Sequence, residues 1–60
     1  MSIGERIKSL RTERGWTRRV LSHMTGFTEK AIADWEKGRY VPSDRGIRAL
    51  EKAFGEQLRK

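Results

Sequence analysis

Residues 23–38, HMTGFTEKAIADWEKG, are the stretch of sequence that decides the fold. A short apolar pattern ends just before a glycine, and a second pattern with helical spacing begins at Thr28. In that second pattern Ile32 and Trp35 fall on one side of a helix, given about 100° of rotation per residue. Gly38 follows the last periodic residue, where glycine commonly ends a helix. The stretch therefore predicts two short helices joined by a tight turn.

The residues before this stretch contain two further helix starts. Thr17 is a good N-cap residue, and the apolar pattern after it consists of Val20, Leu21 and Met24. Near the N-terminus, Ser2 and Glu5 have the spacing of a capping box. The apolar stripe of this first helix is Ile3, Ile7 and Leu10, and the glycine expected to end it is Gly15.

The residues after the stretch predict one more long helix. Ser43 caps its start, and Asp44 in the first turn suits the helix dipole. Its apolar residues are Ile47, Leu50 and Phe54, and Gly55 ends it. Gly46 in the first turn should cost up to about 1 kcal/mol relative to alanine. No strand pattern occurs, so the expected fold class is all-α, with four helices and a short fifth turn in EQLRK, residues 56–60.

Composition and charge narrow the function classes. Sixty residues allow one domain, expected over residues 1–60, with the central helix pair at 17–37. Fourteen Lys and Arg against eight Asp and Glu give a net charge of +6, and such a positive field attracts polyanions. There is no cysteine for a disulfide or a thiolate zinc site, and no apolar run resembles a membrane span or a signal peptide. We therefore expect a cytoplasmic protein without a membrane segment.

Neither catalysis nor metal binding is expected from the residue types present. His23 is the only histidine, no serine or threonine has a plausible base beside it in the sequence, and there is no glycine-rich phosphate loop. A chain of this length scarcely provides a pocket. The expectation is no enzyme activity, no cofactor and no metal.

The outward side of the predicted helix 28–37 has a composition that a major groove accepts. Opposite Ile32, a helical wheel places Lys30, Ala33, Asp34 and Lys37. Glu29 lies near the exposed N-terminal end. Such a helix has apolar side chains on its buried side, short or polar side chains on its outward side, and flanking cations that can contact phosphates. An ordinary amphipathic surface helix has the same pattern, so the pattern alone leaves both interpretations open.

Several pieces of sequence in combination indicate a family. IGERIKSLR at residues 3–11, the turn at Gly26, WEKG at 35–38 and PS at 42–43 occur together. With them the sequence resembles the phage-repressor and Cro helix-turn-helix family, also called the xenobiotic-response-element type, over nearly the whole chain. The resemblance implies a compact lambda-repressor-like domain of four to five helices. It also implies that helix 28–37 enters the major groove of double-stranded DNA.

The resemblance and the positive charges together assign candidate contact residues. The candidates for base readout are Thr28, Glu29, Lys30, Ala33 and Asp34. The candidates for contact with the DNA backbone are Thr17, Arg18, Arg19, Lys37, Arg39, Tyr40, Ser43 and Arg45. A glutamate such as Glu29 can accept a hydrogen bond from cytosine N4, and Lys30 can donate to guanine O6 and N7.

Residues 28–37 hold three acidic and two basic side chains, which is unexpected for a DNA-reading helix. Arg11 matches a first-helix arginine that, in relatives, pairs with the glutamate matched here by Glu36. Glu36 lies only about 40° from Ile32 on the wheel, so both partners would be partly buried, and the pair is interpreted as structural. With Glu36 neutralised the segment is neutral, and Asp34 remains as the side chain that a phosphate-lined groove would repel.

The favoured function is that of a sequence-specific DNA-binding transcriptional regulator, most often a repressor. Its partner would be a double-stranded operator, usually an inverted repeat bound by a dimer, in a bacterial or phage-infected cell and near the nucleoid. Phe54 and Leu58 are the candidates for a weak homodimer contact. The alternative is a protein-interaction module on the same scaffold, such as an antitoxin-like or anti-repressor partner, which the acidic side chains of Glu29 and Asp34 favour.

Overall fold

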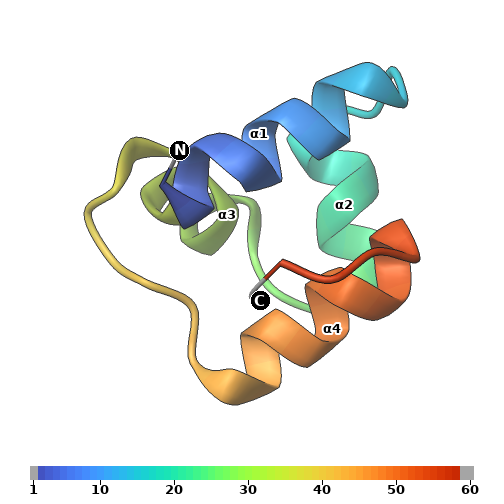
Figure 1. Cartoon of the computed structure of the whole chain (residues 1–60). Helices are drawn as coiled ribbons and strands as arrows, with labels where there is room; N and C mark the ends of the chain where they lie inside the picture. The colour runs from blue at the N-terminus through green and yellow to red at the C-terminus, as the bar shows by residue number, and fades with distance from the viewer. Residues whose placement is uncertain (1, 59–60) are drawn as a thin grey trace.

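The computed structural model of the chain describes residues 2–58 and contains four α-helices (Figure 1). They are α1 (Ile3–Glu13), α2 (Arg18–Thr25), α3 (Glu29–Lys37) and α4 (Asp44–Phe54). No strand occurs in residues 2–58, which agrees with the all-α prediction. No helix within this range is long and apolar enough to cross a membrane.

Each helix begins at the capping residue that the sequence predicts. The side-chain oxygens of Thr17, Thr28 and Ser43 each accept a hydrogen bond from the backbone amide three residues later. At the start of α1, Ser2 Oγ accepts from the Glu5 amide at 3.2 Å, and Glu5 Oε1 accepts from the Ser2 amide at 2.9 Å. These caps satisfy amides that have no partner inside the helix, and loss of one typically costs about 1 kcal/mol.

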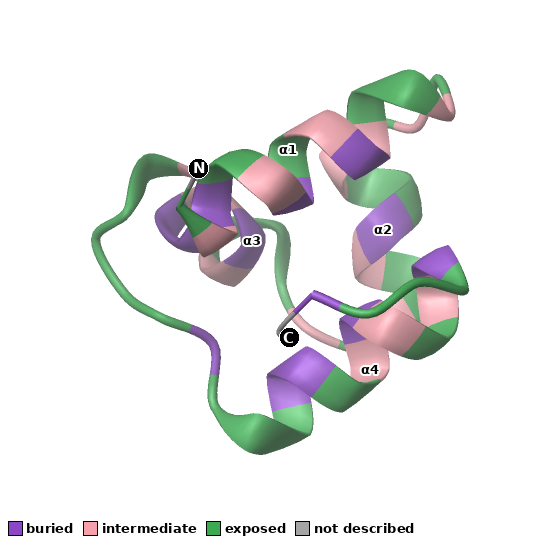
Figure 2. Cartoon of the chain, in the orientation of Figure 1, coloured by how far each residue is buried: buried purple, intermediate pink, exposed green. Residues whose placement is uncertain are grey.

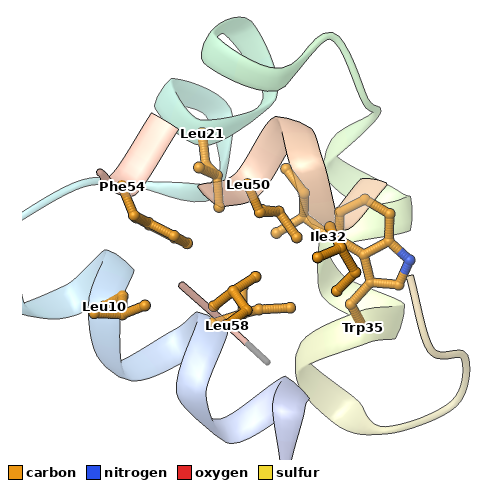
Figure 3. Close-up of a cluster of buried hydrophobic side chains, with 9 residues drawn as sticks. Leu10, Leu21, Ile32, Trp35, Leu50, Phe54 and Leu58 are labelled. Carbon is orange, nitrogen blue, oxygen red and sulfur yellow. The ribbon is translucent and has the colours of Figure 1, made fainter. Parts of the chain in front are cut away.

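The apolar sides of the four helices meet in a single core (Figures 2 and 3). The side chains that are fully buried are Ile7, Leu21, Ile32, Ile47 and Leu50. Two aromatic pairs close the core at its borders. The rings of Trp16 and Phe54 are stacked with centroids 5.8 Å apart, and Phe27 meets Trp35 edge-on at 5.1 Å. The first pair joins the loop after α1 to α4, and the second joins the turn before α3 to α3 itself.

Helix α1 approaches the C-terminal end of α3 closely at Gly4. A Cβ atom on Gly4 would overlap the carbonyl oxygen of Trp35 and lie 3.2 Å from that of Glu36, so only glycine fits without a shift of the backbone. Gly46 has a similar role at the start of α4, since a Cβ there would lie 3.2 Å from Pro42 Cβ. The low helix propensity of these two glycines is therefore matched by close packing.

The predicted apolar side of α2 is only partly correct. Leu21 is fully buried, but Val20 and Met24 are 40% and 47% exposed. Helix α2 has eight residues and packs against both α3 and α4, with Leu21 as its one buried residue. A helix this short buries a narrower side than its apolar pattern suggests, so Val20 and Met24 remain at the surface.

The segment after α4 folds back over the core. Residues 56–58 are not helical, so the expected fifth turn does not form there, and residues 59–60 lie outside the described residues. The amide of Leu58 donates to Glu51 Oε2 at 2.9 Å, and Figure 3 shows its side chain among the core residues. Phe54 is buried in the same cluster. The prediction that Phe54 and Leu58 form a dimer contact is therefore wrong, because the chain itself covers both side chains.

Candidate nucleic-acid interface

Helices α2 and α3 form a helix-turn-helix whose turn is held by side-chain hydrogen bonds. Gly26 has a φ of 80°, in the left-handed region that glycine adopts readily. The Ser22 hydroxyl donates to the Phe27 carbonyl at 2.6 Å, and the Thr25 hydroxyl donates to the Leu21 carbonyl at 2.9 Å. These contacts fix the direction in which α3 leaves α2. In the resulting arrangement one side of α3 is not covered by the rest of the described chain.

The uncovered side of α3 is narrow and has a lysine towards each end. Glu29, Lys30 and Lys37 are exposed, as is the cap residue Thr28, and Ala33 between the lysines is half-buried. The helical wheel places Lys30, Ala33 and Lys37 on this side, and the structure agrees. A small side chain between two cations allows close approach of another surface, and favours an anionic one.

Asp34 does not lie on this exposed side, so the prediction that it points outward is wrong. The residue is 7% exposed. Its Oδ2 accepts a hydrogen bond from Lys30 Nζ at 3.2 Å, and its Oδ1 lies 3.7 Å from Arg39 Nη1. The chain reverses at Gly38, and the Arg39 amide donates to the Asp34 carbonyl at 2.9 Å. An isolated wheel misses this burial because part of the cover comes from residues beyond the helix.

A second carboxylate of α3, that of Glu36, is buried between α1 and α2. Its side chain is 1% exposed. Arg11 donates through Nε to Oε2 at 2.7 Å and through Nη2 to Oε1 at 3.0 Å. Arg18 donates through Nε to Oε1 at 3.1 Å. The structure thus brings Arg11 and Glu36 together as the resemblance implies, and it adds Arg18, for which the sequence indicated only a phosphate contact.

The two arginines decide the charge state of Glu36. Burial raises the pKa of its carboxyl, but the hydrogen bonds and positive charges of Arg11 and Arg18 together outweigh that effect and hold the pKa below its ordinary value. The hydrogen bond between Arg11 and Glu36 also raises the pKa of Arg11. Within α3, all of which is described, Glu29 is the one carboxylate without an ion pair. The excess of acidic over basic residues in 28–37 therefore does not appear at the surface, because the carboxylates of Asp34 and Glu36 are buried and paired with cations.

The other candidates for backbone contact lie at the start of α2, in the loop after α3 and at the start of α4. The exposed ones are Thr17, Arg19, Arg39, Tyr40, Ser43 and Arg45. Thr17 and Ser43 stand at helix N-termini, where free amides and the helix dipole attract anions. Arg18 is less available, because its side chain is 36% exposed and its Nε is engaged by Glu36.

Comparison with known proteins identifies the family. A family model described as helix-turn-helix matches residues 7–60. The chain belongs to the helix-turn-helix family of the phage-repressor and Cro type. A crystal structure of the P22 c2 repressor protein in complex with synthetic operator 9T resembles this helix-turn-helix domain with a TM-score of 0.91 and 29% sequence identity, covering 97% of this chain and 88% of that one. The predicted lambda-repressor-like fold is thereby confirmed.

Other relatives of this helix-turn-helix chain are longer proteins. It is 36% identical over 58 residues to the immunity repressor protein of Bacillus phage phi105, covering 97% of this chain and 40% of the relative. It is 29% identical over 58 residues to multiprotein-bridging factor 1 of Schizosaccharomyces pombe, covering 97% and 39%. The chain spans about two fifths of the length of these curated relatives.

Two features of the site were missed in the sequence, and one of them carried a signal. Lys30 and Asp34 are four residues apart, the spacing of an ion pair along one helix. That spacing was enough to suggest a partner for Asp34. The contact of Arg18 with Glu36 carried no comparable signal, because it depends on how α2 packs beside α1 and α3.

Proposed function

We propose that this chain is the DNA-binding domain of a transcriptional repressor, over residues 1–60 with its helix-turn-helix at 17–37, and that α3 reads a double-stranded operator in the major groove. The observation that carries the proposal is the accessible charge of α3. Its exposed side presents Lys30 and Lys37, while the carboxylates of Asp34 and Glu36 are buried and paired with cations. The similarity to a P22 c2 repressor bound to operator DNA and to a phage immunity repressor supports the same function.

The accessible residues of α3, together with its cap residue Thr28, would have different roles in base readout. Glu29 would accept from cytosine N4, and Lys30 would donate to guanine O6 and N7. Ala33 would lie against the base edges, where a small side chain permits close approach, and Thr28 would contribute its hydroxyl at the start of the helix. Asp34 is not included among the base readers, because it is buried.

Contacts to phosphates would hold the domain in register on the duplex. They would come from Thr17, Arg18, Arg19, Lys37, Arg39, Tyr40, Ser43 and Arg45. Such contacts carry little sequence information but supply much of the affinity, with a strong dependence on salt. Two copies on an inverted repeat would contact half-sites about one helical turn, roughly 10 bp, apart. The protein would act without catalysis or cofactor, in the cytoplasm at the nucleoid.

A protein-interaction module on the same scaffold is the second candidate function. The acidic surface that favoured it in the sequence is reduced to Glu29, because Asp34 is buried. Two other observations favour it: the exposed apolar side chains of Val20 and Met24 on α2, and the relative named multiprotein-bridging factor 1. Exposed apolar residues of this kind mark partner surfaces only where they form a larger patch.

Selection from a random pool of duplexes at about physiological salt tests the proposal, because weak binding to phosphates alone is largely suppressed there. Enrichment of an inverted repeat is expected, and Lys30→Glu should abolish it. Lys8→Glu makes the same change of charge at an exposed residue of α1 outside the proposed interface, and it should leave the enriched sequence unchanged. Recovery of unenriched DNA with the wild-type chain would overturn the proposal and favour a protein partner.

A further inference from the structure

We propose that Asp34 is a positioning residue for DNA recognition: its buried carboxylate orients Lys30 towards a guanine in the major groove and Arg39 towards the adjoining phosphate. The inference rests on the proposed DNA-binding function and goes beyond it, since it assigns a role to a residue that contacts neither base nor phosphate itself.

The geometry around Asp34 supports this role. The carboxylate uses both oxygens, Oδ2 on Lys30 Nζ at 3.2 Å and Oδ1 near Arg39 Nη1 at 3.7 Å. The two cations remain largely accessible, with side chains 81% and 64% exposed, whereas that of Asp34 is only 11% exposed. One buried anion therefore holds the charged ends of two exposed cations that come from different segments, α3 and the loop after it.

Such an arrangement affects recognition because long cationic side chains are flexible. Lysine and arginine lose rotamer freedom when they bind, and contacts that order them beforehand reduce that cost. Asp34 restricts Lys30 near the N-terminal end of the exposed side of α3, where a guanine edge would lie. Asp34 also ties Arg39 to α3, both through its side chain and through the hydrogen bond of its carbonyl with the Arg39 amide.

The cluster formed by Lys30, Asp34 and Arg39 still attracts DNA in spite of the buried carboxylate. Two cations and one anion carry a net charge of +1, so the proposed role does not require a carboxylate to approach phosphates unpaired. Positioning and simple repulsion then make opposite predictions for Asp34→Asn. Removal of a negative charge strengthens binding to every duplex equally, whereas loss of the base contact positioned through Lys30 weakens binding to the operator alone.

The decisive experiment measures affinities for the selected operator and for a scrambled duplex by fluorescence anisotropy, at two salt concentrations. The ratio of the two affinities is compared for the wild-type chain, Asp34→Asn, Lys30→Met and the double variant. Asp34→Asn is expected to lower the ratio about tenfold, within the discrimination that one base contact supplies, while binding to the scrambled duplex is unchanged or stronger. The double variant should have the same ratio as Lys30→Met alone, because Lys30 makes the base contact, whereas the Arg39 contact to phosphate is common to both duplexes and cancels in the ratio.

Two controls separate positioning from folding and from general charge. Thermal melting followed by circular dichroism shows whether each variant is folded at the assay temperature, and Lys30→Met at an exposed site should fold normally. Glu13→Gln removes one negative charge from an exposed residue of α1 and should leave the ratio unchanged.

Each other result overturns a defined part of the argument. If folded Asp34→Asn keeps the wild-type ratio within about twofold, or if its effect adds fully to that of Lys30→Met, Asp34 has no positioning role. If the wild-type chain itself binds both duplexes equally, the proposed function fails, and the role of Asp34 fails with it.

Discussion

Replacement of Glu36 by glutamine is expected to lower the free energy of unfolding by about 3 kcal/mol. Removal of one partner from a buried ion pair costs about 3–5 kcal/mol, because the other charge is left buried without compensation. The lower end applies here, since Arg11 keeps its hydrogen bond to the Trp16 carbonyl at 2.9 Å and Arg18 is 36% exposed to water. A chain of 60 residues has about 3–9 kcal/mol of stability in total, so the loss is a large part of it.

Urea unfolding at pH 7, followed by the fluorescence of Trp16 and Trp35, measures this loss. In a thermal melt the same loss should lower Tm by about 12–24 °C, since 1 kcal/mol corresponds to about 4–8 °C in Tm for a domain of this size. Arg18→Gln is the matched control and should cost less than about 1 kcal/mol, because the guanidinium is partly hydrated. Arg11→Met combined with Glu36→Leu removes both buried charges and should restore much of the stability. A loss below about 1 kcal/mol for Glu36→Gln would refute the reasoning that the charge of this carboxylate holds α3 to α1 and α2.

Three further outcomes follow from the same contacts. Because the pKa of Glu36 is lowered on folding, its charge stabilises the fold above the ordinary carboxyl pKa of 4.5, and this stabilisation disappears as the pH falls through the lower folded value. The stability difference between the wild-type chain and Glu36→Gln should therefore be constant from about pH 7 to pH 5 and shrink in more acidic urea titrations. Gly4→Ala should lower the free energy of unfolding measured in urea by about 1–3 kcal/mol, because the new Cβ overlaps the Trp35 carbonyl. This loss should exceed the gain of up to about 1 kcal/mol that alanine brings in helix propensity, and a stabilised variant would contradict the close approach. Met24→Gln should change stability by less than about 0.5 kcal/mol in thermal melts, because the side chain is 47% exposed, and a loss above 2 kcal/mol would place it in the core.

The starts and ends of the helices could be predicted from the sequence because the responsible interactions are local. Thr17, Thr28 and Ser43 cap amides three residues away, and the glycines that end α2 and α3 adopt a conformation that other residues disfavour. Such interactions need no information on how the helices pack. The apolar stripe of α1 could be predicted for the same reason, since Ile7 and Leu10 recur with the helical period.

The errors arose where burial depends on segments that are distant in the sequence or lie beyond a helix end. Leu58 has no periodic pattern around it, yet the turn after α4 brings it into the core. Asp34 is opposite Ile32 on a wheel, yet the reversal at Gly38 returns Arg39 to it. A helical wheel describes one helix in isolation, so it cannot show side chains that are covered by the next segment.

The charge that a polyanion meets on α3 differs from the charge of its sequence, and this difference bears on specificity. With Asp34 and Glu36 paired, Glu29 is left as an accessible carboxylate beside the exposed cations. An unpaired carboxylate in a major groove is repelled by phosphates and by base acceptors, and it is favourable only opposite a donor such as cytosine N4. Glu29 would then act mainly by weakening the binding of duplexes that lack the donor, which is discrimination by repulsion. Its replacement by glutamine should therefore raise affinity for scrambled DNA more than affinity for the operator.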